Sequence, residues 1–345
     1  MRNLVRYTRN KKIAIPDWVK VEDPMSDIIH TNTSADSIDR RGFLKCMAWA
    51  GTGVIWSVNG GILSSTAMGQ EPANTPESAT AELTFVQISD SHIGFNKPAN
   101  TDVVGTTREA IRRVNALPKT PDFVVHTGDL THLSEPGEFD TLAQLMRECR
   151  IKDVLYVPGE HDYFDNGEQY RERFGKNSIE TGWYSFDHKG VHFIALVNVA
   201  NSQEGGLGTL GQEQLDWLEK DVKGLSNSTP IVLFAHIPLW AIYPQWGWGT
   251  DDAGRALSFV KRFGSVTVLN GHIHQIMQKV EGNITFHTAM GTSFPLPIPG
   301  SVPKPVPVSV EAKQLKKVLG ITRVNYTERN HTLALVDSTL GSSPR

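Results

Sequence analysis

The sequence has few cysteines, little excess charge of either sign and no long uninterrupted hydrophobic run, and each absence excludes a class of protein. Two cysteines in 345 residues cannot form a disulfide framework or a four-cysteine zinc site. A formal net charge of -3 predicts no basic surface for wrapping nucleic acid. The apolar stretch 46–63 is interrupted by glycines and serines, and it is too short and polar to predict a membrane span. With 39% hydrophobic and 21% charged residues, the composition is that of a globular protein.

The first 69 residues have the features of an export signal rather than of a folded domain. Residues 39–45, Asp-Arg-Arg-Gly-Phe-Leu-Lys, resemble the twin-arginine (Tat) signal for export of folded proteins. The apolar stretch 46–63 follows, and Ala67-Met68-Gly69 is typical of a cleavage site. We therefore expect the twin-arginine export machinery as a partner and a periplasmic or secreted location. The segment before the arginine pair is long for a signal, which favours Met25 as the true start. The alternative is a chance Arg-Arg pair before a buried helix.

The rest of the chain predicts one domain between two short polar ends. Residues 70–81 are rich in proline, threonine, serine and glutamate, which predicts a flexible linker. Residues 82–337 form the expected domain, and residues 338–345 are expected to fray. Only Cys149 remains in this part of the chain, so no intramolecular disulfide is expected after cleavage.

Short apolar runs alternate with stretches of helical spacing along the expected domain. Strands are predicted at 83–89, 123–125, 153–157, 183–186, 191–197, 231–234, 266–269, 283–287 and 331–336. Helices are predicted at 106–117, 138–147, 211–222 and 311–319. Runs that are apolar throughout indicate strands covered on both faces, so the pattern predicts an α/β fold.

Carboxylates and histidines follow five of these strands, at the point where each strand ends. They are Asp90 and His92, then Asp129, then Glu160, His161 and Asp162, then His236, and finally His272 and His274. Because the carboxyl ends of strands in α/β sheets converge on one crevice, we expect these side chains to lie together. Carboxylates and imidazoles are ligands of Mn, Fe and Zn. The glycines before three of the clusters are expected to permit the turns that aim the side chains at one centre.

This ordered set resembles the calcineurin-like metallophosphoesterase superfamily, whose pattern is Asp-x-His, Gly-Asp, Gly-Asn-His-Asp/Glu, His and Gly-His-x-His. The resemblance covers about residues 82–275 and implies a four-layer α/β/β/α metallophosphoesterase sandwich with a dinuclear metal centre. It implies one metal on Asp90, His92 and His274, a bridging Asp129, and a second metal on Glu160, His236 and His272. His161 takes the position of the family's leaving-group acid and phosphate-stabilising histidine, with Asp162 to orient it.

The resemblance implies a metal-dependent hydrolase of phosphoesters, either a phosphodiesterase or a phosphatase. Two ions clamp a phosphoryl group and lower the pKa of a bridging water, whose hydroxide attacks phosphorus. His161 then stabilises the phosphoryl group or protonates the leaving alkoxide. Asp162 and the compact spacing are similar to the class III cyclic-nucleotide phosphodiesterase branch, which is generally cytosolic. Because this chain is expected to be exported, its small-molecule or lipid substrate stays open, and no nucleic-acid polymer is expected.

Glu160 departs from the pattern, because the family has asparagine at this position. The extra carboxylate cancels the formal positive charge that Asp90, Asp129 and a bridging hydroxide leave on two divalent ions. A neutral centre attracts phosphate less, unless one ion is trivalent, such as Fe(III). Three interpretations stay open: an active site with an altered metal preference, one for an unusual substrate, and an inactive metal-binding or scaffold protein.

Three further features have more than one interpretation. The aromatic loop at 238–252 either stacks on substrate or folds into the domain, and its Asp251 and Asp252 would disfavour a multiply charged substrate. His132 is a candidate to reach the pocket. The proline-rich segment 294–308 edges the active site, binds a partner or forms a packed surface loop.

Overall fold

The computed structural model describes residues 54–59, 62–67, 83–175, 182–200, 206–327 and 333–342. All belong to the second of two units, Met47–Arg345, and the first unit, Met1–Cys46, lies outside the described residues. The twin-arginine-like motif, the end of the expected cleavage site and the linker at 70–81 therefore also lie outside them. No helix in the described ranges has the length and apolar character needed to cross a membrane.

Two strands lie within the expected signal segment. They are β1 (Val54–Asn59) and β2 (Ile62–Ala67), which pair with each other in an antiparallel register. The alternative of a buried helix does not hold for these two stretches.

The first large sheet carries three of the five polar clusters at its strand ends. Its strands lie in the order β13 (Leu333–Thr339), β12 (Gly320–Tyr326), β3 (Leu83–Ile88), β4 (Phe123–Thr127) and β5 (Val154–Val157). Strands β3, β4 and β5 are parallel, so Asp90, Asp129 and Glu160 emerge at the same edge. β12 is antiparallel to both β3 and β13.

The second large sheet carries the other two clusters. Its order is β10 (Gln278–Glu281), β11 (Ile284–Thr288), β9 (Val266–Asn270), β8 (Ile231–Phe234), β7 (Val191–Ala195) and β6 (Tyr184–His188). β7, β8, β9 and β11 are parallel, whereas β6 and β10 pair antiparallel with their neighbours. His236 and the pair His272 and His274 therefore follow adjacent strand ends.

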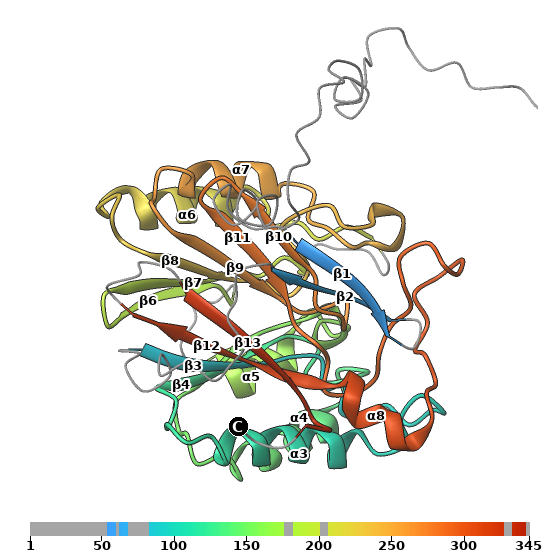
Figure 1. Cartoon of the computed structure of the whole chain (residues 1–345). Coiled ribbons are helices and arrows are strands. Elements are labelled where there is room, and N and C mark those ends of the chain that lie inside the picture. Colours follow the sequence, from blue (N-terminus) through green and yellow to red (C-terminus); the bar gives the residue numbers. More distant parts are fainter. Residues whose placement is uncertain are drawn as a thin grey trace, which may run out of the picture. The chain divides into compact units, whose positions relative to one another are not determined.

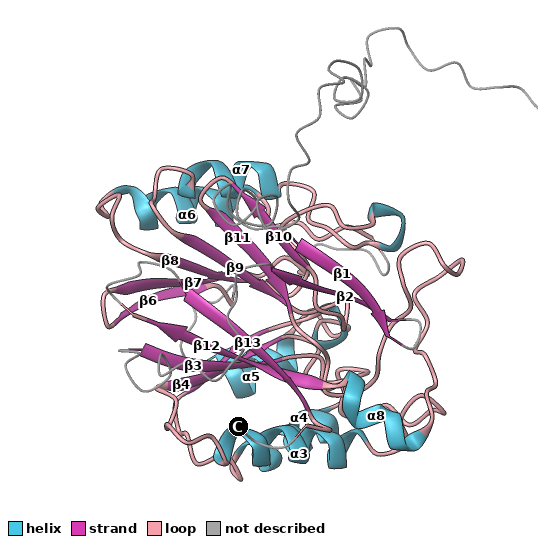
Figure 2. Ribbon diagram, viewed as in Figure 1, coloured by secondary structure: helices cyan, strands magenta, loops and turns pink. Residues whose placement is uncertain are grey.

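Helices cover the outer face of each sheet, which gives four layers (Figures 1 and 2). α3 (Val103–Asn115), α4 (Pro136–Met146) and α5 (Glu168–Phe174) cover the first sheet, and α6 (Gln212–Lys223) and α7 (Ala253–Val260) cover the second. α8 (Ala312–Val318) precedes β12. The predicted α/β/β/α sandwich is confirmed.

An aromatic core joins the two sheets. The ring of Phe85 on β3 contacts Phe193 on β7 and Phe234 on β8 edge to face, with centroids 5.6 and 5.9 Å apart. The next residue, Val86, belongs instead to the core beneath α3 and α4, because successive strand residues point to opposite faces. This packing holds the strand ends of both sheets near one another.

Several elements escape the sequence pattern. It does not predict β10, β12, α5 or α7. In β12, Thr322 and Asn325 are buried, and their side chains hydrogen-bond Asp337 and Thr84. These buried polar residues conceal the strand from a search for apolar runs.

The chain end is better ordered than the sequence predicts. Residues 338–342 are not frayed, because β13 continues to Thr339 and Leu340 is buried. The guanidinium of Arg113 on α3 donates to the carbonyls of Leu340 and Ser342. Residues 343–345 lie outside the described residues.

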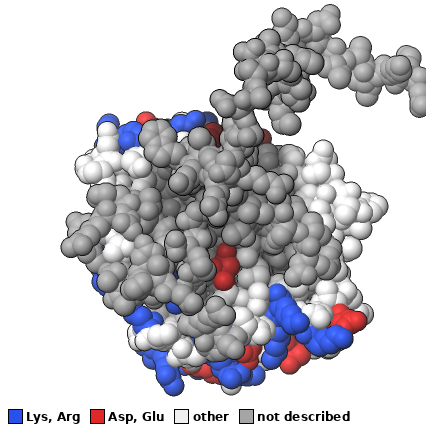
Figure 3. All heavy atoms as spheres, viewed as in Figure 1, with Lys and Arg blue, Asp and Glu red and all other residues white. Residues whose placement is uncertain are grey.

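Charges of both signs are mixed on the surface formed by the helices of the first sheet. Arg108 pairs with Glu148 at 3.0 Å, and Lys313 pairs with Glu311 at 2.9 Å. Figure 3 shows basic and acidic side chains interspersed on this surface. The described residues on this surface therefore carry charges of both signs.

Candidate metal centre

Seven side chains that follow five strands lie together in the structure. Their nitrogen and oxygen atoms form two groups, and the candidate ligand atoms within each group lie within 4.8 Å of one another. The first group is Asp90, His92, Asp129 and His274, and the second is Glu160, His236 and His272. The structure thus brings together every residue that the sequence pattern assigned to metal binding.

Two carboxylates connect the groups. Asp129 Oδ2 lies 3.3 Å from Nε2 of His92 in the first group and 3.3 Å from Nε2 of His236 in the second. Asp90 Oδ1 lies 3.3 Å from His274 Nε2 and 4.0 Å from His236 Nε2. An oxygen equally close to both groups suits a bridging ligand, the position that the resemblance gives to Asp129.

Glu160 lies inside the second group. Its Oε2 is 3.0 Å from His236 Nε2, and its Oε1 is 2.9 Å from His272 Nδ1. It begins the short 3-10 helix η1 (Glu160–Asp162) after β5. Burial opposes ionisation, but the charges of His272 and His236 hold the pKa of Glu160 well below its ordinary value. The structure therefore places the carboxylate of Glu160 among the candidate ligands.

The electrostatics of Asp90 follow the same rule. Burial raises the pKa of a carboxyl group, but His274 and His236 outweigh this effect and lower the pKa of Asp90 to about 2. Both groups thus contain a carboxylate that stays ionised, fully buried in the case of Asp90 and partly exposed in the case of Glu160.

Several buried polar atoms of the centre have no hydrogen-bond partner among the described residues. They are Asp90 Oδ2, Glu160 Oε2, His236 Nε2 and both ring nitrogens of His272. Such atoms are costly in a protein interior and indicate an ion or a water that completes them. Mn, Fe and Zn accept this combination of carboxylate oxygen and imidazole nitrogen. The donor set therefore fits metal ions.

Backbone carbonyls orient two of the histidines. Nδ1 of His236 donates to the carbonyl of Thr127 at 2.7 Å, and Nδ1 of His274 donates to the carbonyl of Phe294 at 2.6 Å. Because a carbonyl only accepts, the ring proton is on Nδ1. Nε2 is therefore the nitrogen that faces the candidate site, and its lone pair becomes available there when the second ring proton is released, as ligation requires.

The backbone is strained at most of the candidate ligands. Five of the seven have φ between 41° and 71°, namely Asp90, His92, Asp129, His272 and His274. The left-handed region costs a residue with a side chain about 1–2 kcal/mol. Strain of this kind concentrates at functional sites, where the surrounding structure maintains it.

The glycines beside the ligands mainly provide space, which corrects the expectation that they form the turns. A Cβ on Gly159 would lie 2.1 Å from Asp129 Oδ1, and one on Gly271 would lie 2.1 Å from Ser89 Oγ. Of the three glycines, only Gly128 also has a positive φ, of 100°. The ligands themselves make most of the turns.

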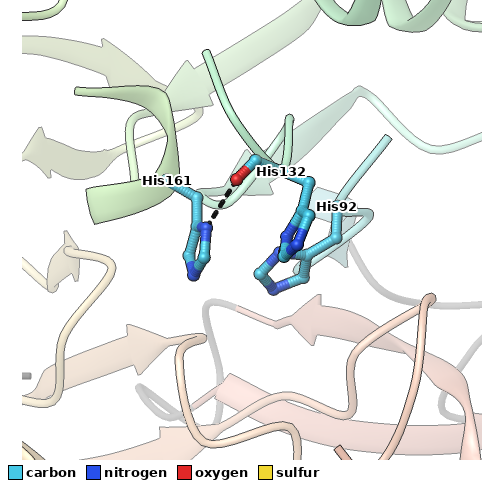
Figure 4. Close-up of side chains that lie close together, drawn as sticks. All are labelled: His92, His132 and His161. Carbon is cyan, nitrogen blue, oxygen red and sulfur yellow. Dashed lines mark hydrogen bonds between the residues drawn. The ribbon is translucent and has the colours of Figure 1, made fainter. Parts of the chain in front are cut away.

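His161 lies beside both groups. Its Nδ1 donates to the carbonyl of His132 at 2.8 Å, which leaves Nε2 as the nitrogen available to a substrate (Figure 4). Burial lowers the pKa of His161, but the carboxylates of Asp129 and Glu160 outweigh burial and raise it above its ordinary value.

Asp162 has a different role from the one expected. Its carboxylate makes no hydrogen bond to the His161 ring in the described structure. It accepts from the backbone N–H groups of Leu130, Thr131 and Gly159 and from the hydroxyl of Thr131. These bonds tie the loop after β4 to the loop after β5. The His132 carbonyl orients the His161 ring, and the charge of Asp162 contributes to the raised pKa of His161 without a hydrogen bond between them.

His132 belongs to the site, although the family pattern quoted above gives it no role. Its ring stacks on that of His161, with centroids 5.1 Å apart and 15° between the planes. Its Nδ1 lies 3.4 Å from Nδ1 of His92 (Figure 4). Burial lowers the pKa of His92 well below its ordinary value and that of His132 to about 4. Both rings are therefore neutral near pH 7.

The aromatic loop folds largely into the domain. Trp246 and Trp248 are buried in the core, and the ring of Trp240 packs edge to face on Phe286. The carboxylate of Asp252 accepts hydrogen bonds from backbone N–H groups of the segment before α6. Its charge is therefore engaged within the protein, which weakens the argument against a multiply charged substrate.

The proline-rich segment borders the centre at its first residue. The ring centroid of Phe294 lies 4.8 Å from those of His92 and His274. Of the three interpretations of this segment, the one that places it at the edge of the site holds for Phe294.

Comparisons with known proteins agree with this geometry. The family model described as calcineurin-like phosphoesterase matches residues 83–276, more than half of the chain. A 3′,5′-cyclic-nucleotide phosphodiesterase of Nostoc sp. is 22% identical over 218 residues, which cover 61% of this chain and 79% of the relative. A probable glycerophosphodiester phosphodiesterase GpdQ of Arcobacter nitrofigilis is 25% identical over 228 residues, with the same coverage of 61% and 79%. Among solved structures, a dimetal phosphatase from Danio rerio has a TM-score of 0.56 at 16% identity, and the match covers 75% of this chain and 97% of that one.

Proposed function

The chain belongs to the calcineurin-like phosphoesterase family and is a metal-dependent phosphoester hydrolase, and we propose that its two ligand groups each hold one metal ion. Asp90, His92 and His274 would hold the first ion, and Glu160, His236 and His272 the second. Asp129 would bridge the two. The observation that carries this proposal is the position of Asp129 Oδ2, 3.3 Å from a histidine Nε2 in each group.

The reaction we propose is hydrolysis of a phosphodiester or phosphomonoester. The ions, when bound, supply Lewis acidity that neutralises phosphoryl charge and makes water a better nucleophile. His161 would present Nε2 to the substrate, where it hydrogen-bonds a phosphoryl oxygen or gives a proton to the leaving alkoxide. The bond from its Nδ1 to the His132 carbonyl keeps the ring in this orientation.

The test of this assignment is metal analysis joined to a substrate panel. The purified protein should contain close to two equivalents of Mn, Fe or Zn and hydrolyse bis(p-nitrophenyl) phosphate. Asp129→Asn should bind less metal, and its rate of hydrolysis should fall at least about 100-fold. A loss of this size is usual when one group that stabilises transition-state charge is removed. Asp251→Asn, on the exposed end of the aromatic loop, is the control. Wild-type protein that binds no metal and cleaves no phosphoester would contradict the proposal.

Substrate choice within this class rests on the relatives. One relative is named for cyclic nucleotides and another for glycerophosphodiesters, so we propose a phosphodiester as the preferred substrate. A panel of a cyclic nucleotide, a glycerophosphodiester and a nucleoside monoester tests it. A clear preference for the monoester would overturn the assignment of a diester substrate but would not affect the assignment as a phosphoester hydrolase.

A second candidate function is supported by Glu160. The extra carboxylate removes net positive charge from the centre, which weakens attraction for a phosphate. A protein that holds both ions but shows no turnover on the panel would be a metal-binding or scaffold protein on the same fold.

We also propose that the protein is exported by the twin-arginine machinery and acts in the periplasm or outside the cell. The proposal rests on residues 39–45 and on the cleavage-like Ala67-Met68-Gly69. Replacing both arginines, Arg40→Lys with Arg41→Lys, should trap a longer precursor in the cytoplasm. If cell fractionation shows the variant exported as well as wild type, the proposed twin-arginine route would be overturned.

A further inference from the structure

His92 differs from the other oriented histidines of the centre in what supports it. His236 and His274 each donate from Nδ1 to a backbone carbonyl. Nδ1 of His92 instead lies 3.4 Å from a side-chain atom, Nδ1 of His132. This support can therefore be removed by substitution without changing the backbone.

The ring of His92 presents opposite nitrogens to the centre and to His132. Its Nε2 lies 3.2 Å from Nε2 of His274 and 3.3 Å from Oδ2 of Asp129. A neutral imidazole has one protonated nitrogen and one lone pair. If Nε2 gives its lone pair to a cation, Nδ1 carries the proton and needs an acceptor, which is the Nδ1 lone pair of His132.

His132 is itself held firmly enough to serve this purpose. Its backbone N–H donates to the carbonyl of Ile93 at 2.9 Å. Its ring stacks on that of His161 and contacts that of Phe95 edge to face, with centroids 5.1 and 5.2 Å away. The ring therefore has a fixed place before any metal binds.

We propose that His132 is a positioning residue, which accepts the Nδ1–H of His92 and so aims Nε2 of His92 at the first metal ion. The inference rests on the proposed function, since it needs a cation in the group of Asp90, His92, Asp129 and His274. Through its carbonyl the same residue also orients His161 (Figure 4). One residue thus sets the direction of a metal ligand with its side chain and of the proposed acid with its backbone.

Two substitutions of similar size distinguish the effect of losing the hydrogen-bond acceptor of His132 from the effect of changing its side-chain volume. Asn places Oδ1 close to where His has Nδ1, so His132→Asn keeps an acceptor for His92. His132→Leu has a similar volume but no acceptor. The carbonyl that orients His161 is present in both.

Cation affinity of the full chain is the measurement, by titrating metal-free protein with Mn²⁺ and with Zn²⁺. We expect His132→Leu to weaken one of two sites by about 10- to 100-fold, the usual loss when the partner of a ligating histidine is removed. His132→Asn should stay within about threefold of wild type on that scale. His132→Ala is measured alongside, so that a folding failure of the Leu variant still leaves a test.

Each contrary outcome has a distinct meaning. Wild-type affinity in the Leu and Ala variants, or equal losses in Asn and Leu, overturns the positioning role while leaving the hydrolase proposal intact. If the wild type binds a third equivalent of cation that all variants lose, the positioning role is overturned. That outcome would indicate a separate cation site on His92, His132 and His161. A wild-type protein that binds no cation overturns the proposed function itself.

Discussion

Oε2 of Glu160 lies 3.0 Å from Nε2 of His236, although the two residues follow strands of different sheets. The contact places the carboxylate of Glu160 at the junction of the two sheets. Glu160 therefore adds a third carboxylate to those of Asp90 and Asp129 among the candidate ligands.

Glu160→Asn should change which metal the protein retains. Loss of the negative charge favours two divalent ions over a pair that includes Fe(III), so the share of iron should fall by about tenfold or more, as when support of a metal site is removed. Elemental analysis of protein grown with equal Mn, Fe and Zn measures it. Glu160→Gln is neutral but keeps the side-chain length of glutamate. Comparing it with Glu160→Asn therefore separates the effect of charge from the effect of side-chain length. An unchanged metal ratio in both variants would show that Glu160 does not ligate.

Asp162→Ala should destabilise the fold rather than act on the chemistry directly. Its carboxylate accepts hydrogen bonds from Leu130, Thr131 and Gly159. Burial and the charge of Asp129 raise the pKa of Asp162 to about 7, so the group is only partly ionised near neutral pH. At about 0.5–1.5 kcal/mol for each hydrogen bond, losing the set should lower the free energy of unfolding by about 3 kcal/mol or more. Urea unfolding of the metal-free protein measures the loss. A variant as stable as wild type but inactive would restore the catalytic role that the sequence pattern suggested.

His192 should make stability depend on pH. Its ring lies between Asp221 Oδ2 at 2.9 Å and Asp187 Oδ1 at 2.7 Å. Burial lowers its pKa, but the bonds to these carboxylates outweigh burial and raise it. A raised pKa means that the folded state binds the proton more tightly, so this stabilisation is complete below the unfolded pKa of about 6.5 and disappears as pH rises through the folded value.

Urea unfolding of His192→Gln measures this effect at two pH values. The stability lost relative to wild type should be greater at pH 5.5 than at pH 8.5. Asp221→Asn should reduce the difference more than Asp187→Asn, because the side chain of Asp221 is 16% exposed and that of Asp187 is 74% exposed. The same loss at both pH values would contradict the prediction.

Phe164→Ala should weaken binding of substrates with aromatic leaving groups. The side chain is half exposed, and its ring centroid lies 5.3 Å from that of the proposed acid His161. Stacking of one base on an aromatic residue contributes about 1–3 kcal/mol, so KM for an aryl or nucleoside diester should rise about fivefold or more. A glycerophosphodiester is the internal control. Equal changes for both substrates would place Phe164 outside the leaving-group contact.

The five strand ends that carry ligands were predictable because a short apolar run is followed within three residues by a carboxylate or a histidine, as in Ile231–Phe234 and His236. The sequence could not reveal β12, because Thr322 and Asn325 in it are buried by side-chain hydrogen bonds rather than by apolar character. It also could not assign His132, since its role depends on the distance between two rings forty residues apart in the chain.

The left-handed backbone at five ligands limits where a different ligand type can enter this centre. Aspartate and histidine are among the few residues with side chains that are enriched in this conformation, and they occupy all five positions. Glutamate is not among these residues. Only positions 160 and 236 among the seven lack a positive φ, and Glu160 stands at the first of these, where a short 3-10 helix begins. The backbone thus favours glutamate at position 160 over the five positions with a left-handed conformation.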